Sequence, residues 1–410
     1  MEVNENSSRR QFLKSAATVA VAAAAHRVAG ATEHISKSGK TFAYVGTYTG
    51  DLGKQKNGEG IYRFELDPHN GDLLHGTLVA RTPSPSWITI HPSKRYLYAI
   101  NEVENFEGNN GSVSAFAIDR GSGALCLINT VSSAGAGPAY MSVDARGKFA
   151  FVANYIGGSI AVLPIRADGS LGSAVCVHHD TGAIGAQRAT NAPAGSFAIS
   201  GHDAPHAHMI HADPNNRFVL STDLGQDRIY SYRLQEETGK LTPVAATPFF
   251  KLPTGDGPRH FAFHPNKRWM YSIQEEASTI AFFHYAPDSG ILDRQQIISA
   301  LPRGFVGTNF SSEIAISAQG NVLYAANRLH NTISVFKIGT DGRLAFAGEN
   351  STMGDYPRNF CIDPTGRFLF ACNQLSDNIV RFHIHESDGS LKFSGNYTAV
   401  PTPACITFLS

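Results

Sequence analysis

The chain repeats one pattern of apolar and polar positions six times. Each copy has a short apolar run, a polar turn that usually contains Lys or Arg, a second apolar run and then a polar residue. Apolar runs of this length, bounded by Gly, Pro, Asn and Asp, are typical of strands, so each copy predicts a β-hairpin. The copies begin 46 to 66 residues apart and span Trp87–Asn101, Tyr140–Asn154, His206–Asp223, His260–Glu275, Glu313–Asn327 and Asn359–Asn373.

A second motif, a glycine turn between the third and fourth strands of each unit, counts the units. Hairpin turns of this kind favour Gly because they need positive φ. Units of about 50 residues with four strands cannot bury their faces alone and must stack around an axis. We therefore predict an all-β fold, a seven-bladed β-propeller over residues 40–410. The seven glycines are Gly71, Gly123, Gly169, Gly239, Gly290, Gly342 and Gly389.

The two ends of this region supply the missing seventh hairpin. Pro403–Phe408 reads as an inner strand without a partner, and Phe42–Tyr48 reads as a second strand without its predecessor. Their pairing would close the ring with strands from both termini and remove an open sheet edge. Two separate sandwiches are the alternative, but no Pro/Ser-rich linker divides the chain.

Composition narrows the function. The 410 residues are 42% hydrophobic and 17% charged, with a formal net charge of zero, which argues against nucleic acid as a partner. No segment has the roughly 18 consecutive apolar residues of a membrane span. The five cysteines match no zinc or haem spacing.

Residues 1–31 read as a signal peptide rather than as part of the fold. Arg9 and Arg10 begin a twin-arginine motif, an apolar run covers Ala16–Ala25, and Ala29-Gly30-Ala31 forms an Ala-x-Ala cleavage site. The alternative is an alanine-rich helix with a chance Arg pair. We expect the twin-arginine machinery to export the folded protein, which would be periplasmic or secreted.

Ionisable residues recur where the hairpins begin and end. In a hairpin these two positions are neighbours, and the innermost strands of a propeller line one channel, so the residues should meet at one mouth. They could instead only hydrogen-bond the backbone. Because the residue type differs from blade to blade, we favour a binding or catalytic site. Its candidate residues are His206, His208, Arg259, His260, Arg328 and Arg358 with Asp223, Glu275, Glu313, Asn154 and Asn373.

Other chemistries have less support. His202, His206, His208 and His211 could bind a metal, but no Cys or clustered carboxylate completes the shell, so we predict no metal and no other cofactor. The Gly-x-Ser-x-Gly elbow of serine hydrolases is missing. The loop Ala183–Pro205 exceeds an ordinary blade connection and is a candidate lid.

Seven segments form a recognisable set of motifs: Pro205–His208, Thr222–Tyr230, Gly257–Phe261, Thr308–Ile314, Ala326–Arg328, Tyr356–Phe360 and Asn154–Ile160. They resemble the motifs of the seven-bladed propeller lactonase family, which includes bacterial 6-phosphogluconolactonases and is similar to fungal carboxymuconate-lactonizing enzymes. The resemblance covers nearly all of residues 40–410. It implies a site built from a His, an Arg-Glu pair and a further Arg, which fall on His206 or His208, Arg259, Glu275 and Arg328.

We therefore expect a hydrolase that opens a small-molecule substrate, a sugar-acid lactone, by water attack in the central pocket. Glu275 or His206 would act as base, and Arg259 and His260 would hold the oxyanion or a substrate carboxylate. Arg328 and Arg358 would bind an anionic tail. Export puts a phosphorylated substrate in doubt, because sugar phosphates are cytoplasmic. A non-catalytic exported binding propeller is the alternative, since propellers host many functions.

Overall fold

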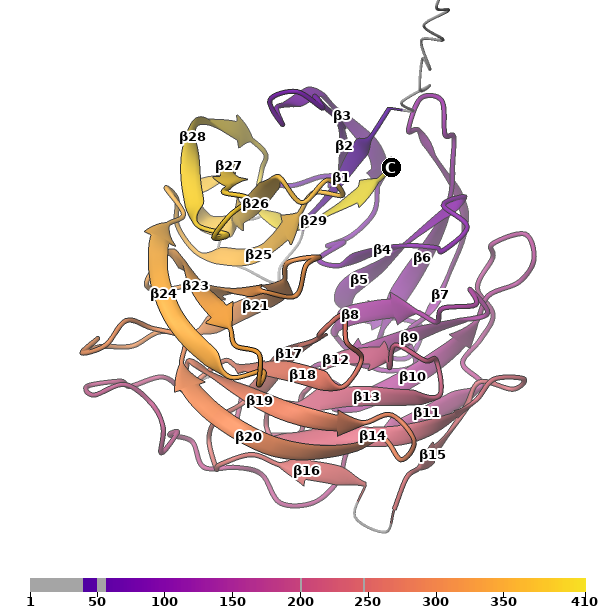
Figure 1. Ribbon diagram of the computed structural model, residues 1–410. Coiled ribbons are helices and arrows are strands. Elements are labelled where there is room, and N and C mark those ends of the chain that lie inside the picture. The colour runs from indigo at the N-terminus through magenta and orange to yellow at the C-terminus, as the bar shows by residue number, and fades with distance from the viewer. Residues whose placement is uncertain (1–39, 50–56, 200, 246–247) are drawn as a thin grey trace, which may run out of the picture. The chain divides into compact units, whose positions relative to one another are not determined.

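The computed structural model describes residues 40–49, 57–199, 201–245 and 248–410. Lys40–Ser410 form one compact unit, whereas the predicted signal peptide lies outside the described residues. The unit consists of seven antiparallel sheets that follow one another in chain order (Figure 1). The described helix is one short 3-10 turn, η1 (Gln374–Ser376), and the described part contains no helix long and apolar enough to cross a membrane.

The first four sheets, called blades 1 to 4, have the following strands in spatial order. Blade 1 contains β29 (Pro403–Leu409), β1 (Phe42–Thr47), β2 (Gly60–Leu66) and β3 (Leu73–Arg81). Blade 2 contains β4 (Ile88–Ile90), β5 (Tyr96–Phe106), β6 (Asn110–Ile118) and β7 (Leu125–Ser132). Blade 3 contains β8 (Pro138–Val143), β9 (Phe149–Asn154), β10 (Ser159–Pro164) and β11 (Cys176–His179). Blade 4 contains β12 (Ala207–Ala212), β13 (Phe218–Asp223), β14 (Arg228–Gln235) and β15 (Lys240–Pro243), with β16 (Phe249–Lys251) also on β14.

Blades 5 to 7 repeat the four-stranded plan. Blade 5 contains β17 (Pro258–Phe263), β18 (Trp269–Gln274), β19 (Thr279–Ala286) and β20 (Ile291–Ser299). Blade 6 contains β21 (Ser311–Ile316), β22 (Val322–Asn327), β23 (Thr332–Ile338) and β24 (Leu344–Ser351). Blade 7 contains β25 (Pro357–Ile362), β26 (Phe368–Asn373), β27 (Asn378–Ile384) and β28 (Leu391–Ala399).

The innermost strands form a closed ring. Each contacts the innermost strand of the next blade, and β25 of blade 7 contacts β29 of blade 1. β29 pairs antiparallel with β1, from Phe42 opposite Leu409 to Gly46 opposite Cys405. The seven-bladed fold and its closure by strands from both termini are therefore confirmed, and blade 1 has no unpaired inner edge.

A repeated contact, which we call the inter-blade clasp, joins each blade to the one before it. The glycine of the turn between the third and fourth strands sits against a large side chain of the preceding blade. In blade 3, Gly169 has φ of 85°, and a Cβ there would lie 2.4 Å from the Tyr96 ring. Tyr98 of blade 2 donates a hydrogen bond to the Gly169 carbonyl at 3.0 Å. The corresponding pairs are Gly71–Phe368, Gly123–Phe42, Gly239–Phe149, Gly290–Phe218, Gly342–Phe282 and Gly389–Val322.

Substitution of a clasp glycine should therefore weaken the ring. We expect Gly169→Ala to destabilise the protein by roughly 2–4 kcal/mol, because it combines positive-φ strain with overpacking against Tyr96. Gly366→Ala is the matched control, since Gly366 has φ of 74° and no atom lies within 4 Å of the position that an added methyl group would take. The control should cost only about 1 kcal/mol. Urea unfolding measures both, and equal losses would contradict the clasp.

Candidate active site

β-bulges at the starts of the innermost strands bring unlike side chains to one end of the ring. The register between first and second strands shifts between Ala207 and Met209, between Pro258 and His260, and between Pro357 and Asn359. The extra residues in these three bulges are His208, Arg259 and Arg358. Because a bulge re-aims a side chain, it lets residues that would alternate in a regular strand face the same cluster.

Glu275 is held by two arginines. Its Oε2 lies 3.0 Å from Arg259 Nε and 2.7 Å from Arg328 Nη2, and all three side chains are buried. Burial alone would raise the pKa of Glu275, but the charges of Arg328 and Arg259 more than offset it, so the pKa is lowered. Glu275 is therefore an ionised carboxylate and a weak base.

His260 and Glu313 form a second pair beside the first. His260 Nδ1 lies 3.0 Å from Glu313 Oε1, and Asn359 donates to Glu313 Oε2 at 2.7 Å. Arg259 joins the two pairs, because its Nη1 donates to the Ser312 carbonyl at 2.7 Å and lies 3.3 Å from His260 Nε2. Burial lowers the pKa of His260, although Glu313 opposes this shift.

His208 is a buried imidazole for which the described residues supply no hydrogen-bond partner. The residue is only 4% exposed, and its Nδ1 has no hydrogen-bond partner within the described part. Burial, followed by the positive charges of Arg259 and His260, lowers the pKa of His208 well below its usual value. The ring is thus neutral at physiological pH and retains an available lone pair.

Aromatic rings cover one side of the histidines. Trp87 and Tyr140 lie 4.2 Å apart between ring centroids, and His260 lies 5.3 Å and 5.2 Å from them. His208 stands 5.0 Å from His260. The cluster therefore has an aromatic wall formed by blades 2 and 3 and an arginine-rich side formed by blades 5 to 7.

Arg358 completes the arginine side through partners that the sequence reasoning missed. Its Nη2 lies 3.8 Å from Glu102 Oε2, and its guanidinium lies 5.2 Å from the centroid of Tyr48. The Tyr48 hydroxyl donates to the same Glu102 oxygen at 2.8 Å. The sequence repeat could have identified both residues. Tyr48 in blade 1 and Glu102 in blade 2 are equivalent in position to Glu275 in blade 5.

His206 is less available than predicted. Its Nδ1 faces the Tyr155 carbonyl at 2.8 Å and its Nε2 faces Asp203 Oδ1 at 2.9 Å. Both contacts are to oxygen acceptors, and the ring stacks on Tyr155 at 4.3 Å. His206 therefore fixes a neighbouring loop and presents no free lone pair.

Three other predicted residues point elsewhere. The Asn154 and Asn373 amides donate to the Ser133 and Thr352 carbonyls at 3.1 Å and 3.0 Å, within their own blade connections. Asp223 Oδ1 accepts a hydrogen bond from the backbone N–H of Gln226 at 2.8 Å, and the Asp223 carboxyl group interacts with that of Asp180. The structure thus gathers seven of the predicted residues with Arg358 nearby: His208, Arg259, His260, Glu275, Glu313, Arg328 and, at the edge, His206.

The four histidines considered as metal ligands have separate environments. His202 lies between two carboxylates, His206 faces Tyr155 and Asp203, and His211 Nδ1 lies 2.6 Å from the Ala212 carbonyl. Within residues 40–49, 57–199, 201–245 and 248–410, no three His, Cys, Asp or Glu side chains form a metal-binding group.

The long loop predicted as a lid is tied to three other segments. Gly185 N donates to the Gly225 carbonyl at 2.8 Å, and Ala186 N donates to Thr254 Oγ1 at 2.7 Å. Further along, Gly307 N donates to the Ala194 carbonyl at 2.9 Å. The loop thus extends from blade 4 to the connection before blade 6.

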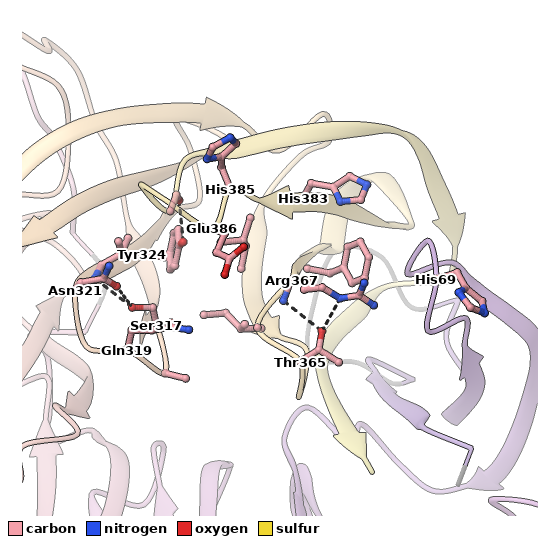
Figure 2. Close-up of a pocket in the computed structure, with 17 residues that line it drawn as sticks. His69, Ser317, Gln319, Asn321, Tyr324, Thr365, Arg367, His383, His385 and Glu386 are labelled. Atoms are coloured by element: carbon pink, nitrogen blue, oxygen red, sulfur yellow. Dashed lines mark hydrogen bonds between the residues drawn. The ribbon is translucent and has the colours of Figure 1, made fainter. Parts of the chain in front are cut away.

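A cavity of ≈ 470 Å³ opens at the opposite ends of the blade 6 and blade 7 strands. Figure 2 shows Arg367, His383, His385 and Glu386 around it. Ser317 and Thr365, from the turns between first and second strands, also line it. Since these turns are at the far ends of β21 and β25 from Glu313 and Arg358, this cavity is separate from the buried cluster.

The described residues form a seven-bladed propeller with a buried polar cluster at one end of its ring of inner strands. A family model described as "Lactonase, 7-bladed beta-propeller" matches residues 42–408. The 6-phosphogluconolactonase of Bacillus subtilis (strain 168) is 34% identical over 371 residues, which cover 90% of this chain and 99% of that protein. The chain belongs to the seven-bladed β-propeller lactonase family and is a lactonase, as its motifs predicted.

Two solved structures agree with this assignment. A putative 6-phosphogluconolactonase from Bacteroides fragilis is 31% identical with a TM-score of 0.80, covering 92% of this chain and 99% of that one. The periplasmic gluconolactonase of Pseudomonas aeruginosa is 29% identical with a TM-score of 0.79, covering 90% and 99%.

The Asp180–Asp223 pair predicts a stability change with pH. Burial, and then the neighbouring Asp223 charge, raises the pKa of Asp180 well above its usual value, and burial likewise raises that of Asp223. A raised carboxyl pKa destabilises the fold increasingly as the pH rises above the unfolded value. Asp180→Asn should therefore stabilise the protein by about 1–2 kcal/mol at pH 8 and by less at pH 5.

Urea unfolding at both pH values tests this expectation. Asp168→Asn is the control, because hydrogen bonds from Ser170 lower the pKa of that exposed carboxylate and its loss should bring no gain. A loss of stability in Asp180→Asn at both pH values would contradict the raised pKa of Asp180.

Proposed function

We propose that this lactonase opens a sugar-acid lactone at the buried cluster, with His208 as general base. The supporting observation is the neutral His208 ring, whose Nδ1 is buried and unpartnered, within the described part, among groups that can hold an anion. A base must have a free lone pair within reach of the attacking water. His206 faces two acceptors, and Glu275 is paired with two arginines. Neither therefore suits the role as well.

In the proposed reaction, His208 takes a proton from water as the water oxygen attacks the lactone carbonyl carbon. The carbonyl π electrons move to oxygen, and Arg259 stabilises the resulting oxyanion. When this intermediate collapses, the ring C–O bond breaks and the protonated His208 returns its proton to the departing alkoxide. The product is the open-chain hydroxy acid, and no other reactant is needed.

The other residues have binding and orienting roles in this proposal. Glu275 fixes Arg259 and Arg328 through Oε2, and His260 is held by Glu313. Arg328 and Arg358 bind an anionic group of the substrate, phosphate or carboxylate. The aromatic wall of Trp87 and Tyr140 packs against the apolar face of the sugar ring.

An anionic substrate would also activate the base. Burial lowers the pKa of His208 first, and the charges of Arg259, His260, Arg358 and Arg328 lower it further. A substrate anion that pairs with Arg328 and Arg358 offsets part of this positive potential. The basicity of His208 then rises on binding, so a carboxylated or phosphorylated lactone should have a higher kcat than a neutral one.

Replacement of His208 tests the proposal. We expect His208→Asn to lower kcat by roughly 10²–10⁴-fold with KM changed only a few-fold, because a positioned base contributes about that much. His211→Asn is the matched control, since His211 lies on the same strand and bonds the Ala212 carbonyl. Hydroxy-acid release above the spontaneous rate, measured with phosphorylated and unphosphorylated sugar lactones, gives both constants.

The pH profile of kcat/KM for wild type supplies a second measurement. Because the base form of His208 exists above its lowered pKa, activity should persist where an ordinary histidine is already protonated and should decline only as the pH falls through the pKa of His208. Full activity in Glu275→Gln and Arg259→Ala, with the fold intact, would contradict the assignment of the site. An inert wild-type protein across the lactones would favour a binding propeller instead.

We also propose that the twin-arginine machinery exports the protein to the periplasm or beyond. The motif at Arg9 and Arg10 supports this, as does similarity to the periplasmic gluconolactonase of Pseudomonas aeruginosa. Cell fractionation of the wild type and of the Arg9→Lys/Arg10→Lys double variant tests it. We expect the wild type in the periplasm or medium and the variant in the cytoplasm. Cytoplasmic wild type would refute export and would favour a phosphorylated substrate.

A further inference from the structure

His202, Asp227 and Glu276 form a buried ion triad. The proposed reaction uses none of these three residues. His202 Nε2 lies 3.0 Å from Asp227 Oδ1, and His202 Nδ1 lies 2.8 Å from Glu276 Oε2. All three side chains are fully buried. The Asp227 contact is a hydrogen bond, whereas the Glu276 contact is short but not aligned as one.

The arrangement implies that His202 is an imidazolium. Burial would lower its pKa, but Asp227 and Glu276 outweigh burial and raise the pKa to about 9. The third carboxyl group in this region is Asp256, which accepts from Asn191 and whose pKa burial raises to about 7. His202 is thus the cation that offsets Asp227 and Glu276, with Arg294 acting on Asp256.

The triad joins three segments that carry candidate site residues. Glu276 Oε1 accepts Gly201 N at 2.8 Å, which fixes the loop that leads to His206. Asp227 accepts the amides of Gly255 and Gly257 at 2.8 Å and 2.9 Å, just before Arg259. Glu276 itself follows Glu275 in the chain.

Close contacts couple these three segments, so that none of them can move without the others. Glu275 N donates to the Gly257 carbonyl at 2.7 Å, so the same residue that Asp227 holds also holds Glu275. Gly185 leaves no room for a side chain, because a Cβ there would lie 1.9 Å from Asp227 Oδ2 and 2.7 Å from His202 Cδ2. A shift of His202 would therefore be transmitted to both ends of the Arg259–Glu275 pair.

We infer that His202, with Asp227 and Glu276, positions the Arg259–Glu275 pair and its neighbouring loop for lactone hydrolysis. The inference rests on the proposed function. None of the three contacts the reacting atoms in the proposed reaction, so they are positioning residues. A displacement of about 1 Å or less at Arg259 would reduce oxyanion stabilisation while leaving binding of the anionic group to Arg328 and Arg358 largely unchanged.

Glu276→Gln is the sharpest test, because it keeps the side-chain size and removes one of the two charges that hold His202 as a cation. We expect kcat to fall roughly 10–100-fold with KM within about threefold of wild type. The alkaline limit of kcat should also move from near pH 9 to about one pH unit lower, since His202 loses a stabilising carboxylate. His202 carries its positive charge only below its raised pKa, so the activity that depends on this charge is lost as the pH rises through that pKa.

The controls separate positioning from stability. His91→Ala removes a histidine that bonds Ser93 and the Gly147 carbonyl at the far end of blade 2, so it should lower the melting temperature without changing kcat or its pH limit. The His202 Cε1–H proton resonance gives the pKa of His202 in wild type and Glu276→Gln without any substrate. His202→Ala is a second variant, expected to lose more activity than Glu276→Gln.

Each outcome then bears on one proposal. Unchanged kcat and alkaline limit in Glu276→Gln, with an NMR pKa that has moved, would refute positioning while leaving the proposed function intact. An NMR pKa near the ordinary histidine value, about 6.5, in wild type would refute the imidazolium. Absence of lactonase activity in wild type would overturn the proposed function. Because the NMR titration needs no substrate, it would still show whether the His202 triad carries its predicted charge.

Discussion

The contact between a turn glycine and a bulky side chain of the preceding blade is what the rest of this structure depends on. It recurs at all seven junctions, and at several a Tyr or Ser hydroxyl also bonds the glycine carbonyl, as Tyr44 does with Gly123. Because each blade is held at both faces by this contact, its tilt toward the axis is fixed. The starts of the innermost strands are then brought together, and the bulges there determine which side chains meet.

The cluster contains several buried charged side chains. The protein tolerates them because groups of opposite charge are paired. Three arginines meet three glutamates, and Arg259 is so crowded that burial and Arg328 lower its pKa to about 10. Such desolvated pairs contribute little to net stability compared with well-packed apolar groups. Their value is functional, because an arginine already fixed by a carboxylate needs no reorganisation when negative charge develops on a substrate.

The repeat made the blade count, the ring closure and the meeting of hairpin ends predictable, since all three follow from strand pairing. Arg259 and Glu275 were found in this way. The repeat did not predict the direction in which each side chain points. His206 and His208 lie two residues apart, one just before β12 and one within it, so alternation cannot distinguish them. The bulge between Ala207 and Met209 aims His208 at the cluster, whereas His206 bonds Tyr155 and Asp203. Asn154 and Asn373 occupy the last position of their strands, which corresponds to Gln274 and not to Glu275, and they bond their own blade connections. Glu102 and Tyr48 were not among the predicted site residues; Glu102 lies within β5, which runs on to Phe106, and Tyr48 directly follows β1, so no strand-ending turn residue marks either position.

The pairing of β29 with β1 places a temporal condition on folding. Blade 1 needs Pro403–Leu409, the last strand of the propeller in chain order, to complete a sheet whose other three strands are the first three of the propeller. The nascent chain can assemble the intervening blades as they emerge, yet the circle stays open until Pro403–Leu409 has left the exit tunnel. Closure of the ring therefore comes after all six other blades have been made, and the edge of Phe42–Thr47 that pairs with β29 must wait unpaired until then.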